Sequence, residues 1–358
     1  MLINSLKQIV DPRQAQGKRY QLWLILIIAI VAVICGAKSY SEISEWGKNH
    51  IEIIKTCLEI KTRTVPCAST FYNILSKIDV NIFENIIYEY IGEKIDKNDA
   101  IAFDGKTMRG TKKKGGEFSH LLSAFSHKLA GTLFQISVDA KTNEIPAIQD
   151  IFKKMNLENK ITTMDALLTQ REIAKTIIEK KGNYVMIVKD NQPELKEDIE
   201  FIVKGEEKFG NNQQSFYTLE KGHGRIEYRE IFVYPSDFIN YWIGAKNIFK
   251  IEREITKKGK TSFETVYGIT SLNTSPEHLL ALVRGHWGIE NKSHWVRDVV
   301  FDEDRSQVKN SNIAQFMASF RNLAITLIRL FVNNKISESI RFLKSKPQLA
   351  FNLVLAKH

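Results

Sequence analysis

An uninterrupted apolar run near the amino terminus constrains the fold of this chain more than any other feature of its sequence. Residues Leu22 to Ala37 (LWLILIIAIVAVICGA) contain neither a charged side chain nor a side-chain amide. A helix that is apolar on every side must be buried, either in protein or in lipid. The run has sixteen residues, whereas a membrane span needs about 20. An amphipathic stretch follows it, so we expect a buried core helix rather than a membrane helix.

Composition narrows the class of protein and its partners. The chain has 358 residues, a length typical of two or three domains. Lys and Arg total 51 and Asp and Glu total 41, so the net charge of +10 favours a polyanionic partner. The three cysteines, Cys35, Cys57 and Cys67, form no CxxC pair. This argues against a disulfide framework and a cysteine zinc site, and it indicates a cytoplasmic protein.

Residues 1–95 are expected to be helical. Apolar residues recur near helical spacing from Ile43 onwards, and Pro66 and Ser69 precede another periodic stretch as helix-start signals. Short helices joined by tight turns are compatible with a helix-turn-helix that reads DNA. They are equally compatible with a small helical bundle that packs on its neighbour, and the sequence leaves both interpretations open.

Strands begin to alternate with helices at Ala100, which indicates an α/β layer. AIAFDGK predicts a short strand that ends at Asp104, followed by a basic loop, and ITTMDA predicts a second strand that ends at Asp165. HLLSAFSHK and GTLFQISVDA predict a hairpin between them. Residues 213–272 are rich in Tyr, Phe, Val and Ile and predict a β-rich block, and a helix is expected to begin at Ser275.

Three acids stand out as candidate catalytic residues: Asp104 and Asp165 at strand ends, and Glu290 within a predicted helix. Such a trio suits metal-assisted phosphodiester cleavage, because Mg²⁺ prefers carboxylate oxygens and water. Two ions about 4 Å apart can activate an attacking hydroxyl and stabilise the leaving oxygen. Without metal, repulsion between the carboxylates would raise at least one pKa. If Glu290 is not the third ligand, Asp298 is the next candidate.

The segment around Glu290 allows more than one interpretation. His286, Glu290 and His294 are four residues apart in turn, so in a regular helix they share one stripe, beside a second stripe that contains Trp287. The first stripe could be a His-Glu-His transition-metal site, or a structural helix with buried tryptophans. We favour the third interpretation, in which Glu290 binds metal while its basic neighbours, His286, Lys292 and Arg297, contact phosphates.

Basic loops complete the pattern and favour nucleic acid as the partner. Lys106, Arg109 and Lys112 to Lys114 follow Asp104 closely. Lys189 and Gln192 follow a predicted strand, and His223 and Arg225 lie beside glycines that would permit close approach to a phosphate. Each of these stretches is a weak signal alone, because a charge run is usually a solvated face.

Blocks of the sequence, in their order, resemble insertion-sequence DDE transposases of the H-repeat-associated protein type. The blocks are AFDGKTMRG, HLLSAFSHKLAGTLFQISVDAKTNEIPAIQDIF, TTMDALLTQREIA, KDNQPELKEDI, GHGRIEYRE and RGHWGIENKSHWVRDVVFDEDRSQ. The stretch DPRQAQGKRYQLWLILIIAIVAVICGAKSYSEISEWG resembles the helical domain that accompanies them. The resemblance places the family's three acids on Asp104, Asp165 and Glu290. The Tyr, Arg and Lys of the signature around the third acid fall on Val283, His286 and Arg297.

The resemblance implies a ribonuclease H-like α/β core with a β-rich insertion, preceded by an all-helical domain. The implied domains are a helical transposase-associated domain at 1–95, a catalytic domain at 96–333 with its insertion at about 205–273, and a helical tail at 334–358. Two Mg²⁺ or Mn²⁺ ions are the implied cofactors.

The implied activity is transposition: cleavage of the ends of an insertion sequence and strand transfer into target DNA. The implied partners are double-stranded DNA and a second copy of the chain on that DNA, with no membrane. The expected location is the bacterial cytoplasm, in association with the nucleoid. Two alternatives stay open. One is an inactive, domesticated DNA-binding relic, and the other is a metal-dependent nuclease without strand transfer.

Overall fold

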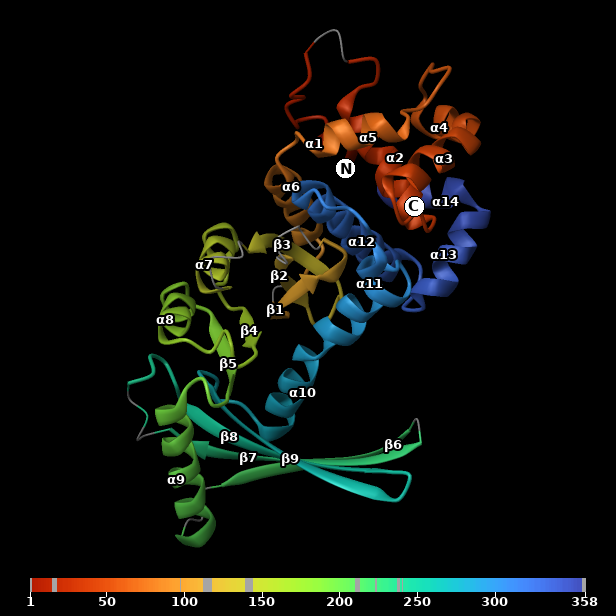
Figure 1. The fold of residues 1–358 in the computed structure, drawn as a ribbon. Coiled ribbons are helices and arrows are strands. Elements are labelled where there is room, and N and C mark those ends of the chain that lie inside the picture. The colour runs from red at the N-terminus through yellow and green to blue at the C-terminus, as the bar shows by residue number, and fades with distance from the viewer. Residues whose placement is uncertain are drawn as a thin grey trace. The chain divides into compact units, whose positions relative to one another are not determined.

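The computed structural model is a mixed α/β protein with one large sheet and many helices (Figure 1). It describes residues 2–14, 18–96, 98–111, 118–138, 144–209, 213–222, 224–236, 239 and 241–355. The chain divides into two compact units, which are considered separately. Unit 1 comprises Met1–Asp96, Gly105–Asn143 and Gly288–His358, and unit 2 comprises Lys97–Asp104 and Glu144–Trp287.

Unit 1 is largely helical. Before residue 97, every regular element among the described residues is a helix, in agreement with the sequence pattern. The helices there are α1 (Leu2–Leu6), α2 (Leu22–Ile34), α3 (Tyr40–Asn49), α4 (Ile51–Leu58), α5 (Ala68–Leu75) and α6 (Val80–Gly92). The carboxyl-terminal part adds α11 (Trp295–Val299), α12 (Ser311–Phe331), α13 (Ile336–Ser345) and α14 (Pro347–Leu355).

The apolar run is the core helix of unit 1. α2 has 13 residues, and all of them except Trp23 are buried. It packs against α3, α12 and α14, which is why no polar stripe is needed on any side of it. The expectation of a buried helix is therefore confirmed. Among the described residues, no helix combines the length and the apolar character that crossing a membrane requires.

A hairpin in unit 1 packs on the same helical core. β2 (Ser119–Ser126) and β3 (Thr132–Val138) pair in antiparallel fashion, as the sequence predicts. α6 and α12 pack against β3. The central helix α12 is buried along most of its length, from Ile313 to Ile328, although the sequence analysis assigned no element there.

Unit 2 is built around parallel and antiparallel strands. β1 (Ala100–Met108), of which Ala100–Asp104 belong to this unit, runs parallel to β4 (Ile161–Met164), and β4 runs parallel to β5 (Asn183–Val188). The β-rich block forms an antiparallel meander beside β5. Its strands are β6 (Gln214–Gly222), β7 (Arg225–Pro235), β8 (Asn247–Lys257) and β9 (Lys260–Thr270). The helices are α7 (Glu144–Lys154), α8 (Arg171–Glu179), α9 (Pro193–Phe209) and α10 (Pro276–His286). The strand order is β3-β2-β1-β4-β5-β9-β8-β7-β6.

Two local expectations were wrong. The first strand does not end at Asp104 but continues to Met108, and a single 3₁₀ turn follows at Arg109–Thr111. Its first four residues pair with β4, and β2 is its neighbour on the other side in the strand order. This extension could not be predicted from the apolar pattern, because polar residues replace apolar ones beyond Phe103.

The second wrong expectation is the regular helix around Glu290. α10 ends at His286, a π-helical turn (η3) spans Ile289–His294, and α11 begins at Trp295. Backbone hydrogen bonds in a π turn join residues five apart, whereas those in an α-helix join residues four apart. Residues four apart in a π turn therefore no longer share one stripe. The stripe of His286, Glu290 and His294 is therefore not formed as predicted.

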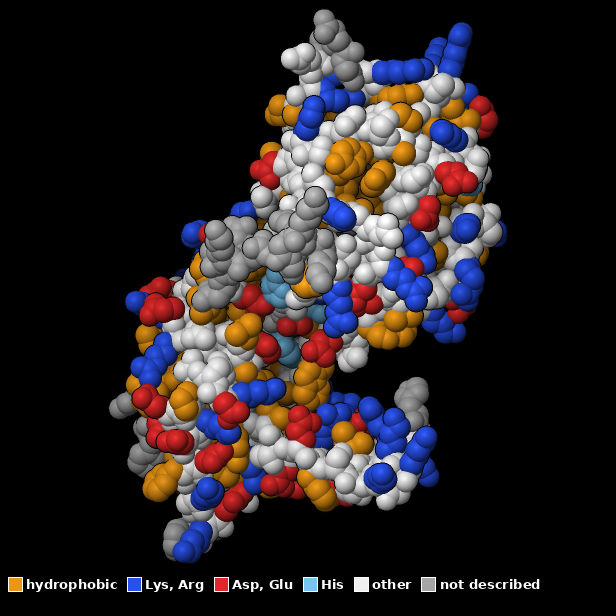
Figure 2. Space-filling view, in the orientation of Figure 1, with side chains coloured by type: hydrophobic (Ala, Val, Ile, Leu, Met, Phe, Trp, Pro, Cys, Tyr) orange, Lys and Arg blue, Asp and Glu red, His pale blue; other side chains and the backbone are white. Residues whose placement is uncertain are grey.

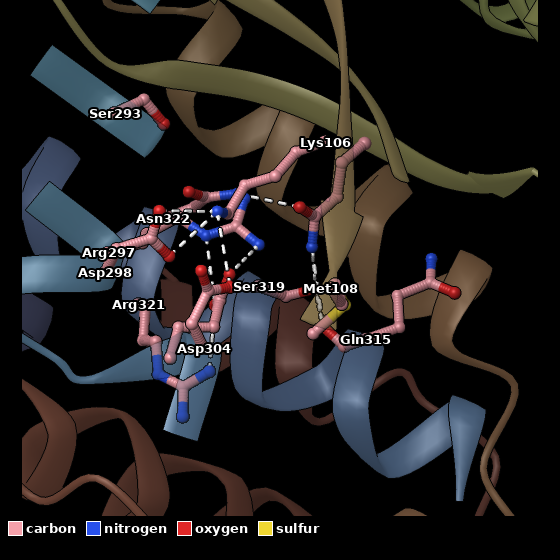
Figure 3. Close-up of polar contacts among 12 residues, drawn as sticks. Lys106, Met108, Ser293, Arg297, Asp298, Asp304, Gln315, Ser319, Arg321 and Asn322 are labelled. Atoms are coloured by element: carbon pink, nitrogen blue, oxygen red, sulfur yellow. Dashed lines mark hydrogen bonds and ion pairs between the residues drawn. The ribbon is translucent and has the colours of Figure 1, made fainter. Parts of the chain in front are cut away.

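Buried charges fasten α11 to α12 in unit 1 (Figure 3). The carboxylate of Glu303 accepts hydrogen bonds from Nε of Arg297 at 3.0 Å and from a terminal nitrogen of Arg321 at 2.8 Å. Arg321 also donates to the carbonyl oxygen of Lys38, at 2.9 Å. Burial by itself raises the pKa of Glu303, but the charges of the two arginines outweigh it and lower the pKa to about 2. We call Arg297, Glu303 and Arg321 the charge clamp.

Replacing the carboxylate of the charge clamp is expected to destabilise the protein strongly. Glu303→Gln leaves two buried guanidinium groups without their counter-charge, which costs about 3–5 kcal/mol of unfolding free energy. The stabilisation is present at neutral pH and is lost as the pH falls from the unfolded value of about 4.3 towards the folded value. Denaturant titrations of wild type and variant between pH 7 and 2.5 measure both effects.

Glu338→Gln is the matched control, because Glu338 pairs with Lys335 at 3.4 Å on the surface. An exposed pair is worth about 0–1 kcal/mol. If the two variants lose equal stability at pH 7, the charge clamp does not hold unit 1 together.

Candidate functional site

Two of the predicted acids come from neighbouring parallel strands of unit 2: Asp104 lies within β1, and Asp165 directly follows β4. The register of β1 and β4 runs from Ala100 opposite Ile161 to Phe103 opposite Met164, and Asp104 and Asp165 are the residues that come next along the chain. Parallel strands lie about 4.8 Å apart. Both aspartates are partly exposed. The fold therefore brings two positions close together that are 61 residues apart in the sequence.

The loop after β4 holds Asp165 in a defined setting. An Oδ of Asp165 accepts a hydrogen bond from the backbone N–H of Leu168 at 3.2 Å. The hydroxyl of Thr169 lies 3.0 Å from the carbonyl oxygen of Asp165 and 2.6 Å from that of Ile187. This links the loop to the neighbouring strand β5. Thr169 was not among the residues predicted from the sequence. A Ser or Thr soon after an Asp at a strand end is nevertheless a signal for a turn in which the hydroxyl bonds the backbone.

Electrostatics make Asp165 an unfavourable place for a bare negative charge. Burial raises the pKa of this carboxyl, and the charge of Glu144 raises it further, while the backbone hydrogen bond from Leu168 and the charge of Lys189 lower it. The net result is a raised pKa. A cation bound beside the carboxylate would relieve this cost, so the environment of Asp165 suits a metal ligand.

The third predicted acid, Glu290, belongs to unit 1 and is exposed on the π turn. The turn is held from both sides: Arg329 donates to the carbonyl oxygen of Lys292 at 2.6 Å, and the hydroxyls of Ser293 and Thr132 lie 3.2 Å apart. π turns occur frequently at functional sites. No group of three His, Cys, Asp or Glu side chains with metal-binding placement occurs within the described ranges.

Four of the expected phosphate ligands have protein partners. Lys106 is buried and donates to both carboxylate oxygens of Asp298, at 2.8 and 2.7 Å, so the alternative third acid is itself neutralised. Arg297 belongs to the charge clamp. Gln192 donates to the carbonyl oxygen of Thr169 at 3.0 Å and braces the loop after Asp165.

His286 is the fourth of these, and it is buried with Nδ1 3.1 Å from the hydroxyl of Thr163. Burial lowers the pKa of His286 to about 4, so the ring is neutral at pH 7 and brings no positive charge to a phosphate. Trp287 follows it directly, and the guanidinium of Arg253 lies 5.5 Å from the centre of the indole ring.

The remaining expected ligands are exposed cations: Arg109, Lys189, Arg225 and Lys292. Arg109 lies 3.9 Å from Asp304, and Arg225 lies 3.1 Å from Glu227. His223 and the basic residues Lys112 to Lys114 lie outside the residues that the structure describes.

The meander adds cations that the sequence analysis did not single out. Arg225 faces Lys257 across β7 and β8, and Lys257 faces Lys260 across β8 and β9. In the described part of the chain, neither lysine has a carboxylate within 4 Å, and Figure 2 shows Lys and Arg gathered over this end of the meander. Like charges placed opposite one another destabilise a sheet. The sequence KKGK at 257–260 was the available signal.

Removing the charge of Asp165 is expected to stabilise the metal-free protein. Since the folded pKa of Asp165 lies above the unfolded value, its ionisation disfavours folding at pH 7, and Asp165→Asn removes that cost. The variant should unfold at a higher temperature in EDTA. At a pH below the folded-state pKa of Asp165, the difference in unfolding temperature between the variant and the wild type should vanish. Added Mg²⁺ should raise the unfolding temperature of the wild type but not that of Asp165→Asn. Scanning calorimetry measures the unfolding temperature of both proteins in each condition.

Asp150→Asn serves as the control, because Asp150 is exposed on α7 and pairs with Lys153 at 2.7 Å. A midpoint for Asp165→Asn equal to or below that of the wild type in EDTA would contradict the role of burial.

Comparison with known proteins places the chain in a family. The family pattern described as "Transposase DDE domain" matches residues 96–327, and the pattern "DDE_Tnp_1-associated" matches residues 3–91. Among solved structures, a piggyBac transposase synaptic complex with hairpin DNA aligns over all of this chain and 79% of that chain, at 11% identity and a TM-score of 0.41. Likeness at that level does not establish a shared fold.

Three curated relatives match nearly the whole chain. YncI of Escherichia coli O157:H7 is 33% identical over 346 residues, which cover 92% of this chain and 87% of YncI. YbfL and the H repeat-associated YhhI, both of Escherichia coli K12, are 32% and 31% identical over 340 residues, which cover 91% of this chain and 90% of each relative. The chain therefore belongs to the DDE transposase family, and within it to the H repeat-associated type.

Proposed function

We propose that this protein is a polynucleotidyl transferase that cleaves the ends of its own insertion sequence and joins them to target DNA. The observation that carries the proposal is the register that sets Asp104 beside Asp165, in a chain of the DDE transposase family. The raised pKa of Asp165 supports it, since this carboxylate is poised to gain from a bound cation.

Asp104 and Asp165 would hold two Mg²⁺ or Mn²⁺ ions, and Glu290 would complete the set from the π turn. Bound metal supplies Lewis-acid stabilisation of the attacking and leaving oxygens. The donors fit these ions, because all three are carboxylates. Thr169 and Gln192 act as positioning residues that fix the loop carrying Asp165.

Two phosphoryl transfers make up the proposed reaction. Water attacks the scissile phosphorus at an element end, and the bond to the 3′ oxygen breaks to release a 3′-hydroxyl. That hydroxyl then attacks a phosphorus of target DNA and displaces another 3′ oxygen. Arg109, Lys189, Arg225 and Lys292 would hold the DNA backbone together with Lys257 and Lys260 of the meander, since exposed cations suit phosphates. Trp287 would contact DNA beside them.

The fold proposed for the catalytic part is ribonuclease H-like, over residues 96–333, with a β-rich insertion at about 205–273. The order β3-β2-β1-β4-β5, with β1, β4 and β5 parallel, supports it. Residues 1–95 would form the associated helical domain and residues 334–358 a helical tail. We further propose that the protein acts as a homodimer on double-stranded DNA in the bacterial cytoplasm, because two element ends must be cut and joined.

Loss of one metal ligand is expected to abolish cleavage but leave DNA binding intact. Asp104→Asn should lower the rate of Mg²⁺-dependent cleavage of an element-end duplex at least about 100-fold. Its duplex affinity in EDTA should match the wild type. Gel-resolved cleavage and fluorescence anisotropy measure the two quantities.

Asp190→Asn is the matched control, because Asp190 also follows a strand closely but is exposed and pairs with Lys196. Glu290→Gln and Asp298→Asn test the third position: only the first should abolish cleavage. If Asp104→Asn cleaves normally, the proposal is wrong. A wild type that binds but never cleaves would be a relic, and one that cleaves without joining would be a nuclease.

A further inference from the structure

A concave, basic surface lies among the amino-terminal helices of unit 1 and includes no residue that was assigned a role above. Two pockets form it, of about 540 and 580 Å³, and they share Arg13 and Thr70. Lys48 and Ile51 contribute from the junction of α3 and α4, and Thr70 contributes from the first turn of α5 (Figure 1).

The lining of the two pockets contains five cations and no acidic side chain: Arg13, Arg19, Lys48, Arg63 and Lys77. Asp11 offsets the charge of Arg13, at 2.7 Å. Within the described ranges, no carboxylate lies within 4 Å of the other four, and all four are exposed. Positive charges gathered in a concavity repel one another, and a bound anion would relieve that repulsion.

The walls of this surface are fixed by hydrogen bonds. The hydroxyl of Tyr20 donates to the carbonyl oxygen of Val65 at 3.1 Å and lies 2.6 Å from the hydroxyl of Thr64. The guanidinium of Arg19 donates to the same Thr64 hydroxyl at 2.9 Å. Arg13 donates to the carbonyl oxygen of Tyr20 at 2.6 Å. The cations on this wall are thus held in place before a ligand arrives, which lowers the entropy cost of binding.

We propose that these two joined pockets, which we call the amino-terminal basic pocket, bind successive phosphates of duplex DNA. A single small anion would occupy only a small part of one pocket, whereas a polyanion can extend through two pockets that share a wall. This inference rests on the proposed function for the identity of the polyanion. It assigns DNA binding to the helices before residue 97, through the backbone rather than through base edges.

Removal of two cations from the pocket is expected to change the salt dependence of binding. Each phosphate contact contributes about 0.9 to the slope of log affinity against log salt concentration. Lys48→Ala with Arg63→Ala should therefore reduce the slope by about 2, for element-end and unrelated duplexes alike. Full-length protein in EDTA is titrated at several salt concentrations, so that metal and cleavage play no part.

Lys55→Ala with Lys94→Ala is the matched control. It removes two charges from the same group of helices, but Lys55 pairs with Glu52 and Lys94 lies over the ring of Tyr90. The control should keep the slope of the wild type. Equal slopes in both double variants would overturn the inference.

Cys67 provides a second, local readout, because it lines the pocket and is exposed. Hydrogen bonds with Ser69 and Thr70 lower the pKa of this thiol to about 7, so it reacts readily at neutral pH. In a Cys57→Ser background, bound duplex should slow alkylation of Cys67 by N-ethylmaleimide at least several-fold. Cys35 is buried and will not contribute.

The two double variants then decide what protects the thiol. Protection should be lost in Lys48→Ala with Arg63→Ala and kept in the control. Unslowed alkylation under saturating duplex, or protection by polyglutamate but not by DNA, would overturn the inference in favour of no ligand or an acidic protein segment. Asp104→Asn should show full protection, so a failure of the catalytic proposal would remain distinguishable.

Discussion

The free-energy cost of holding charges of one sign in partly buried or crowded places is the constraint on which the candidate functions of this protein depend. The parallel register of β1 and β4 sets Asp104 beside Asp165 in a partly buried place, where the pKa of Asp165 is raised. Cations face one another across the meander and line the amino-terminal basic pocket. Burial raises the pKa of Asp165, and the crowded cations repel one another, so a ligand of opposite charge would offset the cost in each place.

Charges with a structural role in the same chain are buried and paired with charges of opposite sign. Glu303 is enclosed by Arg297 and Arg321, and Lys106 is held by both oxygens of Asp298. In these places every buried charge has a counter-charge, as the low dielectric of a protein interior requires. The contrast between buried charges enclosed by counter-charges and exposed or partly exposed charges clustered with others of the same sign separates residues that hold the fold from candidate binding residues.

The sequence predicted the buried helix α2, the hairpin of β2 and β3, and the β-rich meander, because each has a strong local pattern. It could not predict that Lys106, His286 and Arg297 would be buried with protein partners. These side chains can bind a phosphate as well as a carboxylate or a hydroxyl of the protein. Which of these they bind depends on their neighbours in the folded structure. The four cations Arg19, Lys48, Arg63 and Lys77 escaped notice for the same reason, since they are scattered along the chain.

The π turn at Ile289–His294 makes the spacing along this segment as informative as its residue types. Each residue of an α-helix advances the chain by about 100° around the axis. Deleting a single residue here would let the turn relax to regular α-helix and would rotate Glu290 relative to α11, even if every side chain with a proposed role were kept. Comparisons of homologous chains should therefore weigh length in this segment above identity, because a shortened copy would keep Glu290 and still turn it to another side of the segment.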